Sequence, residues 1–461
     1  MASQPDDSQA IQQLPDDKRE MLNRMGVMLE EGRLPFFIFN DQDIFDLEMK
    51  HIFGENWIFV GHESEIPEPG DYARRYIGKD PFIFIRNEDG GVQVLFDSCR
   101  HRGTKIARAD EGNASHFRCP YHGWTYNNKG QLIGIPEKEK AYCEIDTEEW
   151  KLAEPADVDS YRGMVFATLS DDSPPLEEYL GDMTWHLDAI LGFAEGWEVI
   201  GTPSRYVVDN DWKSGVENFG GDDYHLAATH QTALEQEHMH VNWIRGSDEA
   251  AGLAERAHVH FEDLPEMGHS ISHGLIDEDM DSYYGYPDEL RGDFNADAIN
   301  EDQWEVARRG VVGVGSIFPN LSILQIALGN GVKQAGFFNL KLWQPKEPGQ
   351  MELWNWFLVP KGADEEYKQL AHDVAMGTFS PSGTWEQDDM AVWDGVAESA
   401  GTVFAKKNEV TTNYLMGMGD MSDTEEYEEF PAPGHVYTNY YQEGYARSLH
   451  KRWHHEIVNG S

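Results

Sequence analysis

The chain has 461 residues, more than one ordinary hydrophobic core accommodates, so we expect two domains, one larger than the other. Hydrophobic residues make up 40% and aromatic residues 12% of the chain, which is enough to fill both cores and argues against wholesale disorder. The 83 acidic and 36 basic residues give a formal charge of −47, and such a surface disfavours binding to nucleic acid or to an anionic membrane.

Acidic residues occur in every region of the chain, from PDD near the start to TEEYEEF at 424–430. This distribution favours the solvated surface of a halophilic protein over a single docking tail. The first residues contain neither the basic start nor the apolar core of a secretory signal, and no apolar run reaches the roughly 18 residues that cross a bilayer. We therefore expect a cytoplasmic protein.

Residues 1–53 are predicted to form a polar lead followed by a helix, because DQDIFDLEMKHIFG places apolar residues at helical spacing. From 54 to 172 the pattern changes to short strands and turns. Here PFIFIR and VQVLF, joined through NEDGG, predict a β-hairpin with a glycine-rich turn. The stretch SPPLEEYLGD, at 173–182, marks the predicted domain boundary.

Residues 173–461 combine long strand-like runs with helical pieces. The runs are NLSILQIAL, GFFNLKLWQP and MELWNWFLVP, and helical patterns occur around 217–235 and 363–376. This mixture predicts an α+β domain built on an antiparallel sheet.

Two of the three cysteines occur in matched pairs with histidine, in the stretch CRHRGTKIARADEGNASHFRCPYHGW. Cys99 and His101 follow the strand VQVLF, and Cys119 and His122 lie in a second loop rich in Pro, Tyr and Gly. With Cys143 as the only other cysteine, a disulfide framework is disfavoured and metal ligation is favoured. Two thiols and two imidazoles suit a structural zinc ion or an iron–sulfur centre, and their spacing separates these alternatives only weakly.

The segments CRHRG and CPYHGW resemble the two ligand loops of Rieske proteins. The resemblance implies a [2Fe-2S] cluster in which Cys99 and Cys119 ligate one iron and His101 and His122 the other. Trp124 is expected either to cover these loops or to belong to the ordinary core.

Five basic residues stand out around these loops in an otherwise acidic chain. They either balance neighbouring carboxylates or guide an acidic redox partner to the cluster. We call them the basic cluster: Arg100, Arg102, Lys105, Arg108 and Arg118.

A second metal site is predicted in GVENFGGDDYHLAATH, at 215–230. Asp222 and His225 are three residues apart and hence share one face of a helix, whereas His230 would lie about 140° away from His225 on an ideal helix. Both histidines reach one metal only if the helix widens or ends there. Two imidazoles and one carboxylate form the facial triad of non-haem Fe(II) sites, and TFSPSGTWEQDD, at 378–389, is the other candidate source of the carboxylate.

Over nearly its full length the chain resembles the large (α) subunit of Rieske non-haem iron aromatic-ring-hydroxylating dioxygenases, on the strength of CRHRG, CPYHGW, ENFGGDDYHLAATH and WEQDD. The resemblance implies an all-β Rieske domain and an α+β catalytic domain with a helix-grip-like antiparallel sheet. It also implies His225, His230 and Asp389 as ligands of a mononuclear iron, with Asp388 as the rival to Asp389.

By the same resemblance Asp222 hydrogen-bonds a ligand histidine and links it to a Rieske histidine of a neighbouring subunit. Asn218, Phe219, Phe379 and Trp385 match pocket positions, although the three aromatic residues would equally suit ordinary core packing. Asp223 we interpret as part of the general acidity of the chain.

The resemblance further implies electrons from NAD(P)H, delivered by a separate reductase or ferredoxin, and cis-dihydroxylation of an arene or arene carboxylate by O2. It implies an α3β3 assembly with a small β subunit, or an α3 homotrimer. Two alternatives stay open: a Rieske monooxygenase or demethylase, and a non-catalytic electron carrier or zinc-stabilised binding protein. The motifs do not name the substrate.

Overall fold

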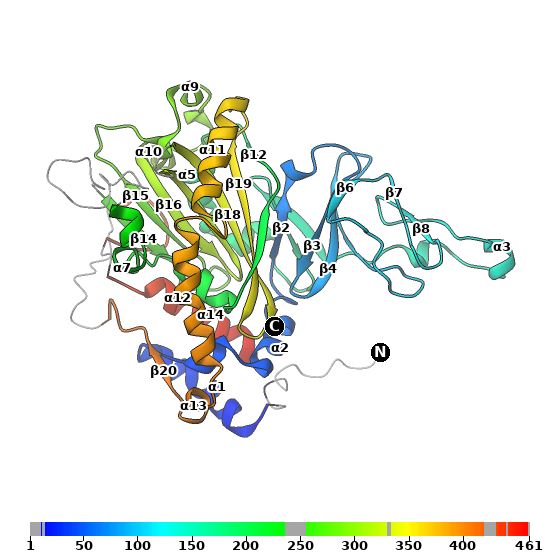
Figure 1. Ribbon diagram of the computed structural model, residues 1–461, viewed down its shortest axis with the longest axis horizontal. Coiled ribbons are helices and arrows are strands. Elements are labelled where there is room, and N and C mark those ends of the chain that lie inside the picture. Colours follow the sequence, from blue (N-terminus) through cyan, green and yellow to red (C-terminus); the bar gives the residue numbers. More distant parts are fainter. Residues whose placement is uncertain are drawn as a thin grey trace. The chain divides into compact units, whose positions relative to one another are not determined.

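The computed structural model describes residue 11 and residues 14–235, 255–329, 333–418, 430–438 and 441–459. The chain forms two compact units, both of which are drawn in Figure 1. The smaller unit is Phe53–Leu176, and the larger unit combines Met1–Ile52 with Glu177–Ser461.

The smaller unit consists of three small antiparallel sheets, the short helix α3 and two 3-10 helices, η4 (Glu63–Glu65) and η5 (Glu148–Trp150). The strand orders are β10-β11-β2, β5-β4-β3-β6 and β7-β8-β9. Antiparallel pairing of β4 with β5 confirms the predicted hairpin, whose turn contains Gly90 at a φ of 84°. The element bounds are β2 (Ile58–His62), β3 (Asp71–Ile77), β4 (Asp80–Arg86), β5 (Val92–Phe96), β6 (Glu111–Asn113), β7 (His116–Arg118), β8 (Thr125–Asn127), β9 (Leu132–Gly134), α3 (Lys138–Ala141), β10 (Asp157–Tyr161) and β11 (Met164–Thr168).

The core of the smaller unit encloses both paired cysteines. Cys99 and Cys119 are buried in one apolar cluster with Trp124, Tyr126 and residues of β4, β5 and β7. The two loops that carry the cysteines are therefore packed against the sheets rather than extended into solvent.

The larger unit is built on an antiparallel sheet with the strand order β12-β19-β18-β17-β16-β15-β14-β21, to which β13 adds by pairing with β19. The three predicted strand-like runs are β17, β18 and β19, and every residue of β17 is buried. The strand bounds are β12 (Trp197–Val199), β13 (Ser204–Val208), β14 (Glu255–His260), β15 (Ser270–Leu275), β16 (Gly310–Ile317), β17 (Leu321–Gly329), β18 (Gln334–Glu347), β19 (Gln350–Pro360) and β21 (His435–Tyr437).

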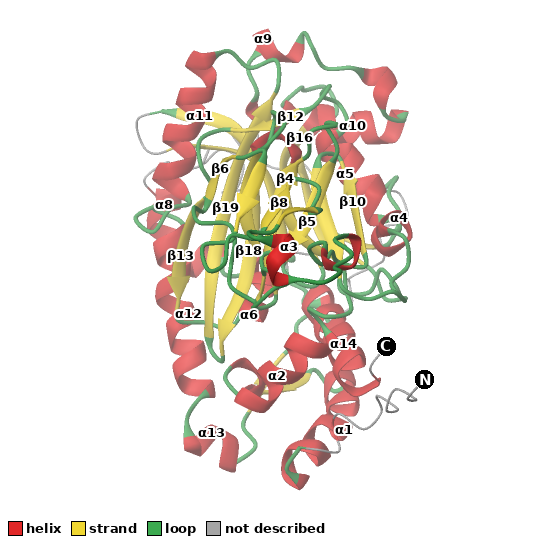
Figure 2. Ribbon diagram, turned by 90° about the vertical axis from the view of Figure 1, so that its right-hand side faces the viewer, coloured by secondary structure: helices red, strands yellow, loops and turns green. Residues whose placement is uncertain are grey.

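Helices cover this sheet and make the larger unit α+β, as predicted. Helix α11 packs on β17, β18 and β19, and α6 packs on β16, β17 and β18. Figures 1 and 2 show α11, α12 and α13 following one another along the sheet. The bounds are α4 (Leu176–Leu180), α5 (Met183–Leu191), α6 (Trp212–Phe219), α7 (Leu226–Thr229), α8 (Gln231–Glu235), α9 (Asp288–Arg291), α10 (Glu301–Arg309), α11 (Glu365–Thr378), α12 (Glu386–Ala400), α13 (Val403–Lys407) and α14 (Gly444–Asn459).

The amino-terminal residues belong to the larger unit. The predicted helix is α2 (Gln42–His51), and the Asp41 side chain caps it by accepting the N–H groups of Asp43 and Ile44. The lead also contains helix α1 (Asp16–Glu30), which was not predicted and which packs on α14. Between them, β1 (Arg33–Pro35) pairs with β20 (Thr411–Asn413).

A buried charge network ties α2 to the start of α6. Lys213 Nζ lies 2.7 Å from Asp211 Oδ1 and donates to Glu48 Oε1, which also accepts the indole N–H of Trp453 at 2.7 Å. Glu48 and Lys213 are both fully buried, so their charges are compensated by each other rather than by water. The network fixes the helix that leads to GGDDYH. No helix in the described part of the chain is both long and apolar enough to span a membrane.

Candidate metal centres

The two Cys/His loops of the smaller unit have the same backbone structure. The Cys99 N–H donates to the Thr104 carbonyl at 2.9 Å, and the Cys119 N–H donates to the Trp124 carbonyl at 2.8 Å. In each loop the glycine four residues after the cysteine donates back to the cysteine carbonyl, with Gly103 at a φ of 73° and Gly123 at 75°. That backbone conformation favours glycine, which explains the G of CRHRG and of CPYHGW.

The four predicted cluster ligands come together in pairs, with the two cysteines in one buried cluster and the two imidazoles side by side. Cys99 and Cys119 are buried, His101 is partly buried and His122 is exposed. The two imidazole centroids are 4.5 Å apart, and the buried Nδ1 atom of His101 has no hydrogen-bond partner. Two thiols and two imidazoles, one with an orphaned ring nitrogen, fit a Rieske cluster with two ligands on each iron.

Two aromatic residues support the ligands from within the core. The Trp124 ring stacks on His101 at 5.0 Å with an angle of 10° between the planes, and Trp124 is only 3% exposed. Trp124 therefore covers a ligand and also belongs to the core, so both roles that the sequence left open for it apply. The Tyr126 hydroxyl lies 3.5 Å from the Cys99 sulfur and accepts the Arg100 N–H at 3.0 Å.

The basic cluster is exposed throughout. Within the described residues none of its five members forms an ion pair. Arg100 instead lies 6.0 Å from the centroid of Trp150, and Lys105 lies 5.6 Å from that of Tyr76. No contact supports the view that these cations balance neighbouring carboxylates, so their charge faces solvent beside the cluster loops.

The larger unit brings His225, His230 and Asp389 together. One donor atom from each lies within 4.8 Å of the other two, and no second group of this kind occurs in the part of the chain that the structure describes. Asp389 Oδ1 is 3.1 Å from His230 Nε2 and 3.6 Å from His225 Nε2. This carboxylate oxygen is buried without a hydrogen-bond partner, which fits two imidazoles and a carboxylate that share a metal ion.

The spacing of His225 and His230 requires the helix between them to widen or to end if both rings are to reach one metal ion. His225 precedes α7 and His230 follows it, where the backbone leaves the helix with φ −101° and ψ 16°. The helix ends there, which is one of the two conditions under which both rings could reach the same ion.

Asp388 and Asp389 point to different nitrogens of His230. Asp388 Oδ2 lies 3.6 Å from Nδ1, whereas Asp389 faces Nε2. Since successive residues of a helix are turned by about 100°, adjacent carboxylates on α12 cannot face the same point. The geometry groups Asp389, and not Asp388, with the two histidines.

Asp222 lies against His225 from the other side. Its carboxylate accepts the His225 N–H at 3.2 Å, its backbone carbonyl hydrogen-bonds His225 Nδ1, and its Oδ2 is 3.5 Å from the same nitrogen. Burial alone would lower the pKa of His225, but Asp222 and then Asp389 outweigh it and raise that pKa to about 9. Asn218, at the end of α6, is partly buried, and its carbonyl accepts the Asp222 N–H at 3.2 Å.

Of the three predicted pocket aromatics, Trp385 lies beside a ligand histidine, and Phe219 and Phe379 lie near each other. Trp385 lies 4.7 Å from His230, and Phe219 lies 6.5 Å from Phe379 between ring centroids. The sequence did not predict a cation here, yet Lys341 Nζ lies 4.9 Å from the Phe219 ring and 4.7 Å from the Phe379 ring. All three aromatics are buried, so each belongs to the core, and Trp385 also lies beside a ligand histidine.

The interpretation of Asp223 as general surface acidity is wrong. Its side chain is 7% exposed and forms a two-fold hydrogen-bonded ion pair with Arg256, whose side chain is 4% exposed. Burial favours the neutral acid, but Arg256, through its charge and its hydrogen bonds, outweighs it and holds the pKa of Asp223 below its ordinary value. Nothing in the sequence pairs these residues, because the chain between them is long and no local motif links them.

Comparison with protein families assigns both units. Residues 56–161 match the family described as the Rieske [2Fe-2S] domain, and residues 176–456 match the family described as the ring hydroxylating alpha subunit (catalytic domain).

Individual relatives match over most of their length. The alpha subunit of an N,N-dimethyl phenylurea N-demethylase from Sphingobium sp. is 38% identical and covers 86% of each chain. The alpha subunit of biphenyl 2,3-dioxygenase from Rhodococcus jostii is 30% identical and covers 92% of this chain and 88% of that one. The crystal structure of naphthalene 1,2-dioxygenase from Rhodococcus sp. bound to indole is 34% identical, with a TM-score of 0.88 over 96% of this chain and 99% of that one.

Proposed function

Because the chain belongs to the family of ring-hydroxylating alpha subunits, Rieske non-haem iron oxygenases, we propose that it is a terminal oxygenase that adds both atoms of O2 to an aromatic ring. The observation that carries this proposal is the group of His225, His230 and Asp389, of which the last two are buried, with the Trp385 ring beside His230. The product would be a cis-dihydrodiol, formed from the arene, O2, two electrons and two protons.

Each group of residues has a defined task in this proposal. Cys99, Cys119, His101 and His122 hold the cluster, and His225, His230 and Asp389 hold the mononuclear iron. When bound, these cofactors supply single-electron transfer and the activation of O2.

The remaining residues of the site bind, orient and shield. Asp222 fixes the orientation of the His225 ring through the hydrogen bond between its backbone carbonyl and Nδ1, with its carboxylate beside the same nitrogen. Phe219, Phe379 and Trp385 orient the aromatic substrate and exclude water. Asn218 holds the backbone of Asp222 in place.

The electron donor is a further part of the proposal. Electrons originate from NAD(P)H and arrive through a separate reductase or ferredoxin, which docks at the basic cluster by charge complementarity. The assembly is α3β3 with a small β subunit, or α3. Light scattering of the purified chain, alone and coexpressed with a candidate β subunit, distinguishes the two.

Oxygen labelling tests the reaction. The purified chain with a reconstituted reductase is given 18O2 and an arene such as naphthalene or biphenyl. A cis-diol that carries two labelled oxygen atoms supports dioxygenation. A product that carries one labelled atom contradicts it.

The relationship to an N-demethylase favours a second candidate function, because that relative is 38% identical over 399 residues. Demethylation would consume a methylated amine, O2, two electrons and two protons, and would release the amine, formaldehyde and water. Substrate-dependent O2 uptake, measured in parallel with arenes, arene carboxylates and N,N-dimethyl phenylureas, separates the two reactions and identifies the substrate class. Formaldehyde release without diol formation selects demethylation.

The acidic composition supports the proposal that this enzyme works in the cytoplasm of a halophile. Salt screens the mutual repulsion of acidic side chains, so the folded state should gain stability as salt is added. A melting temperature that rises steadily from low to molar KCl is expected, and one that falls over this range speaks against the halophilic origin.

A further inference from the structure

Asp223 and Arg256 are joined by two parallel hydrogen bonds. Arg256 Nε donates to Oδ2 at 2.6 Å, and Nη2 donates to Oδ1 at 2.5 Å. A guanidinium and a carboxylate paired in this way lie in one plane and fix each other's orientation, which a single bond does not do. The pair therefore ties the segment between α6 and α7 to strand β14 at a defined angle.

A second residue of β14 borders the same carboxylate. His258 Nε2 lies 3.4 Å from Asp223 Oδ2, and His258 Nδ1 lies 3.1 Å from the Ser272 hydroxyl on β15. Burial lowers the pKa of His258 to about 4, so this ring is neutral near pH 7. Asp223 is thus held by Arg256 and bordered by a neutral ring that is itself held by the neighbouring strand.

The segment between α6 and α7 has little intrinsic rigidity. Gly220 and Gly221 precede the two aspartates, and Gly221 has a φ of 146°. Glycines have more backbone freedom than other residues, so the segment gains little stiffness from its own sequence. Asp223 lies directly after Asp222 and two residues before His225, so its orientation controls both neighbours.

A second ion pair holds the segment that carries the remaining ligand. Glu386, the first residue of α12, pairs with Lys341 on β18, and each side chain is 1% exposed. Asp389 follows Glu386 by three residues and therefore lies nearly on the same face of the helix. The first turn of α12, which also carries Asp389, is thus tied to the sheet.

We propose that the Asp223–Arg256 and Glu386–Lys341 ion pairs are positioning groups that hold the two ligand-bearing segments in the metal-binding arrangement. This inference rests on the proposed iron site. Each pair connects a segment that carries ligands to a strand of the same sheet, so the sheet sets the distance between the segments. The ligand atoms then need little rearrangement when the ion binds.

Stability alone is a weak explanation for these pairs. Replacing a buried ion pair by apolar residues of similar volume is often neutral or stabilising, so burial of charge does not by itself favour the fold. What a paired charge adds is a fixed orientation, and residues that orient metal ligands typically affect metal affinity by about 10-fold to 100-fold.

The test measures Co(II) affinity at the mononuclear site. The full chain is treated with a chelator that removes the mononuclear iron and retains the Rieske cluster, and it is then titrated with Co(II). The variants are Asp223→Asn, Arg256→Met, Arg256→Lys and Glu386→Gln. Melting temperatures and the visible spectrum of the cluster verify that each variant is folded.

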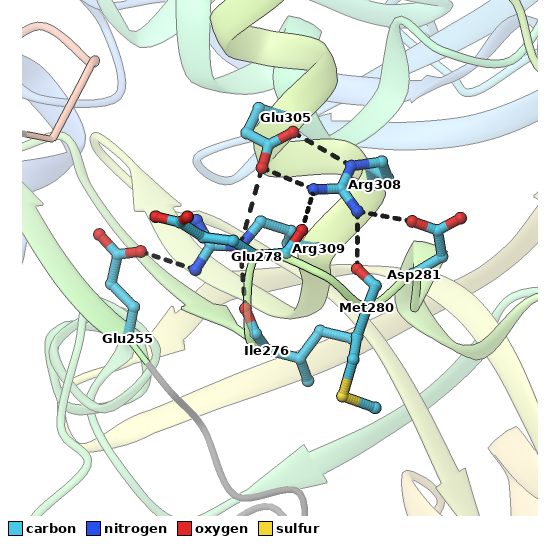
Figure 3. Close-up of polar contacts among 8 residues, drawn as sticks. All are labelled: Glu255, Ile276, Glu278, Met280, Asp281, Glu305, Arg308 and Arg309. Atoms are coloured by element: carbon cyan, nitrogen blue, oxygen red, sulfur yellow. Dashed lines mark hydrogen bonds and ion pairs between the residues drawn. The ribbon is translucent and has the colours of Figure 1, made fainter.

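Arg308 offers a matched control in the same unit. Figure 3 shows its guanidinium bonded to Glu305, Asp281 and the Met280 carbonyl, none of which lies in a ligand-bearing segment. The variant Arg308→Met removes an arginine with several partners and leaves the segments around His225 and Asp389 untouched.

We expect Asp223→Asn, Arg256→Met and Glu386→Gln to weaken Co(II) binding by about 10-fold to 100-fold. Arg256→Lys should recover part of the loss, since it restores the charge without the two-fold geometry. Arg308→Met should bind as the wild type does.

Unchanged Co(II) affinity in Asp223→Asn and Glu386→Gln, or an equal loss in Arg308→Met, overturns the inference. The variant His230→Ala separates this failure from failure of the proposed function. If His230→Ala loses Co(II) binding while the positioning variants keep it, only the positioning inference fails. If His230→Ala still binds Co(II) as the wild type does, the iron site itself is wrong and the inference falls with it.

Discussion

The Oδ1 atom of Asp389 lies 3.1 Å from Nε2 of His230, whereas the carboxylate of Asp388 faces Nδ1 of the same ring. The variant Asp389→Ala should therefore lose the mononuclear iron and all oxygenase activity, while its cluster spectrum is retained. Asp388→Ala should keep the iron and at least part of the activity, because it removes a contact at the nitrogen turned away from the site. Iron per chain, measured by elemental analysis, separates the two variants, and equal iron loss in both would contradict this assignment.

Tyr126 should tune the reduction potential of the cluster. Its hydroxyl contacts the Cys99 sulfur at 3.5 Å, and hydrogen bonds to ligand sulfur favour the reduced, more negative cluster. The variant Tyr126→Phe should lower the potential by roughly 40 mV, the one-electron equivalent of a hydrogen bond of about 1 kcal/mol. Tyr142→Phe is the control. It likewise removes one tyrosine hydroxyl, from a residue whose ring packs edge-on against Trp124. Potentiometric titration of the cluster decides, and equal potentials in Tyr126→Phe and wild type would contradict the assigned role.

The basic cluster should determine how fast the electron donor binds. Reversing the charge in Arg102→Glu should raise the KM for the reductase or ferredoxin by about tenfold at low ionic strength, and added salt should reduce the difference. Lys407→Glu, at an exposed position of α13, changes the net charge by the same amount in the larger unit, which does not contain the cluster loops. Steady-state kinetics with varied donor concentration provide the readout. Equal KM values in Arg102→Glu and Lys407→Glu at low salt would rule out docking at the basic cluster.

Buried histidines should make the larger unit sensitive to mild acid. Burial lowers the pKa of His186 to about 4 and that of His269 to about 3, from an ordinary value of 6.5. Between these values the unfolded chain binds more protons than the folded one. The stability that depends on the neutral rings is therefore complete above about pH 6.5 and decreases as the pH falls toward 4, by roughly 1 kcal/mol per pH unit for each histidine.

The variant His186→Gln removes one of these titrating groups. Its melting temperature should fall less between pH 7 and pH 5 than that of the wild type. His116→Gln, at an exposed position, should leave the wild-type dependence unchanged. The same pH dependence in all three proteins would show that His186 does not contribute.

The cluster loops could be predicted because the residues that determine their backbone conformation lie close together in the sequence. Cysteine, histidine and the glycine with positive φ lie within a few residues of one another in both loops, so the motif itself specifies the fold of each loop. The hairpin of β4 and β5 and the long strands β17 to β19 were predictable for the same reason, from local alternation and composition.

The ion pairs around the iron site could not be predicted in this way. Asp223 and Arg256 are 33 residues apart, and Lys341 and Glu386 are 45 apart, so only the sheet brings them together. In a chain with 83 acidic residues, one more aspartate beside Asp222 carries no signal of burial. The available hint was Arg256 within the strand ERAHVH, where a buried cation requires an acidic partner that the sequence does not identify.

Metal and sulfide analysis of the protein as isolated tests the central claim most directly, namely that one chain holds a Rieske cluster and a mononuclear iron. The account predicts a brown protein with about three iron atoms and about two acid-labile sulfides per chain, of which one iron is lost in Asp389→Ala. A colourless protein that contains zinc, or one with two irons and two sulfides that Asp389→Ala leaves unchanged, would contradict it.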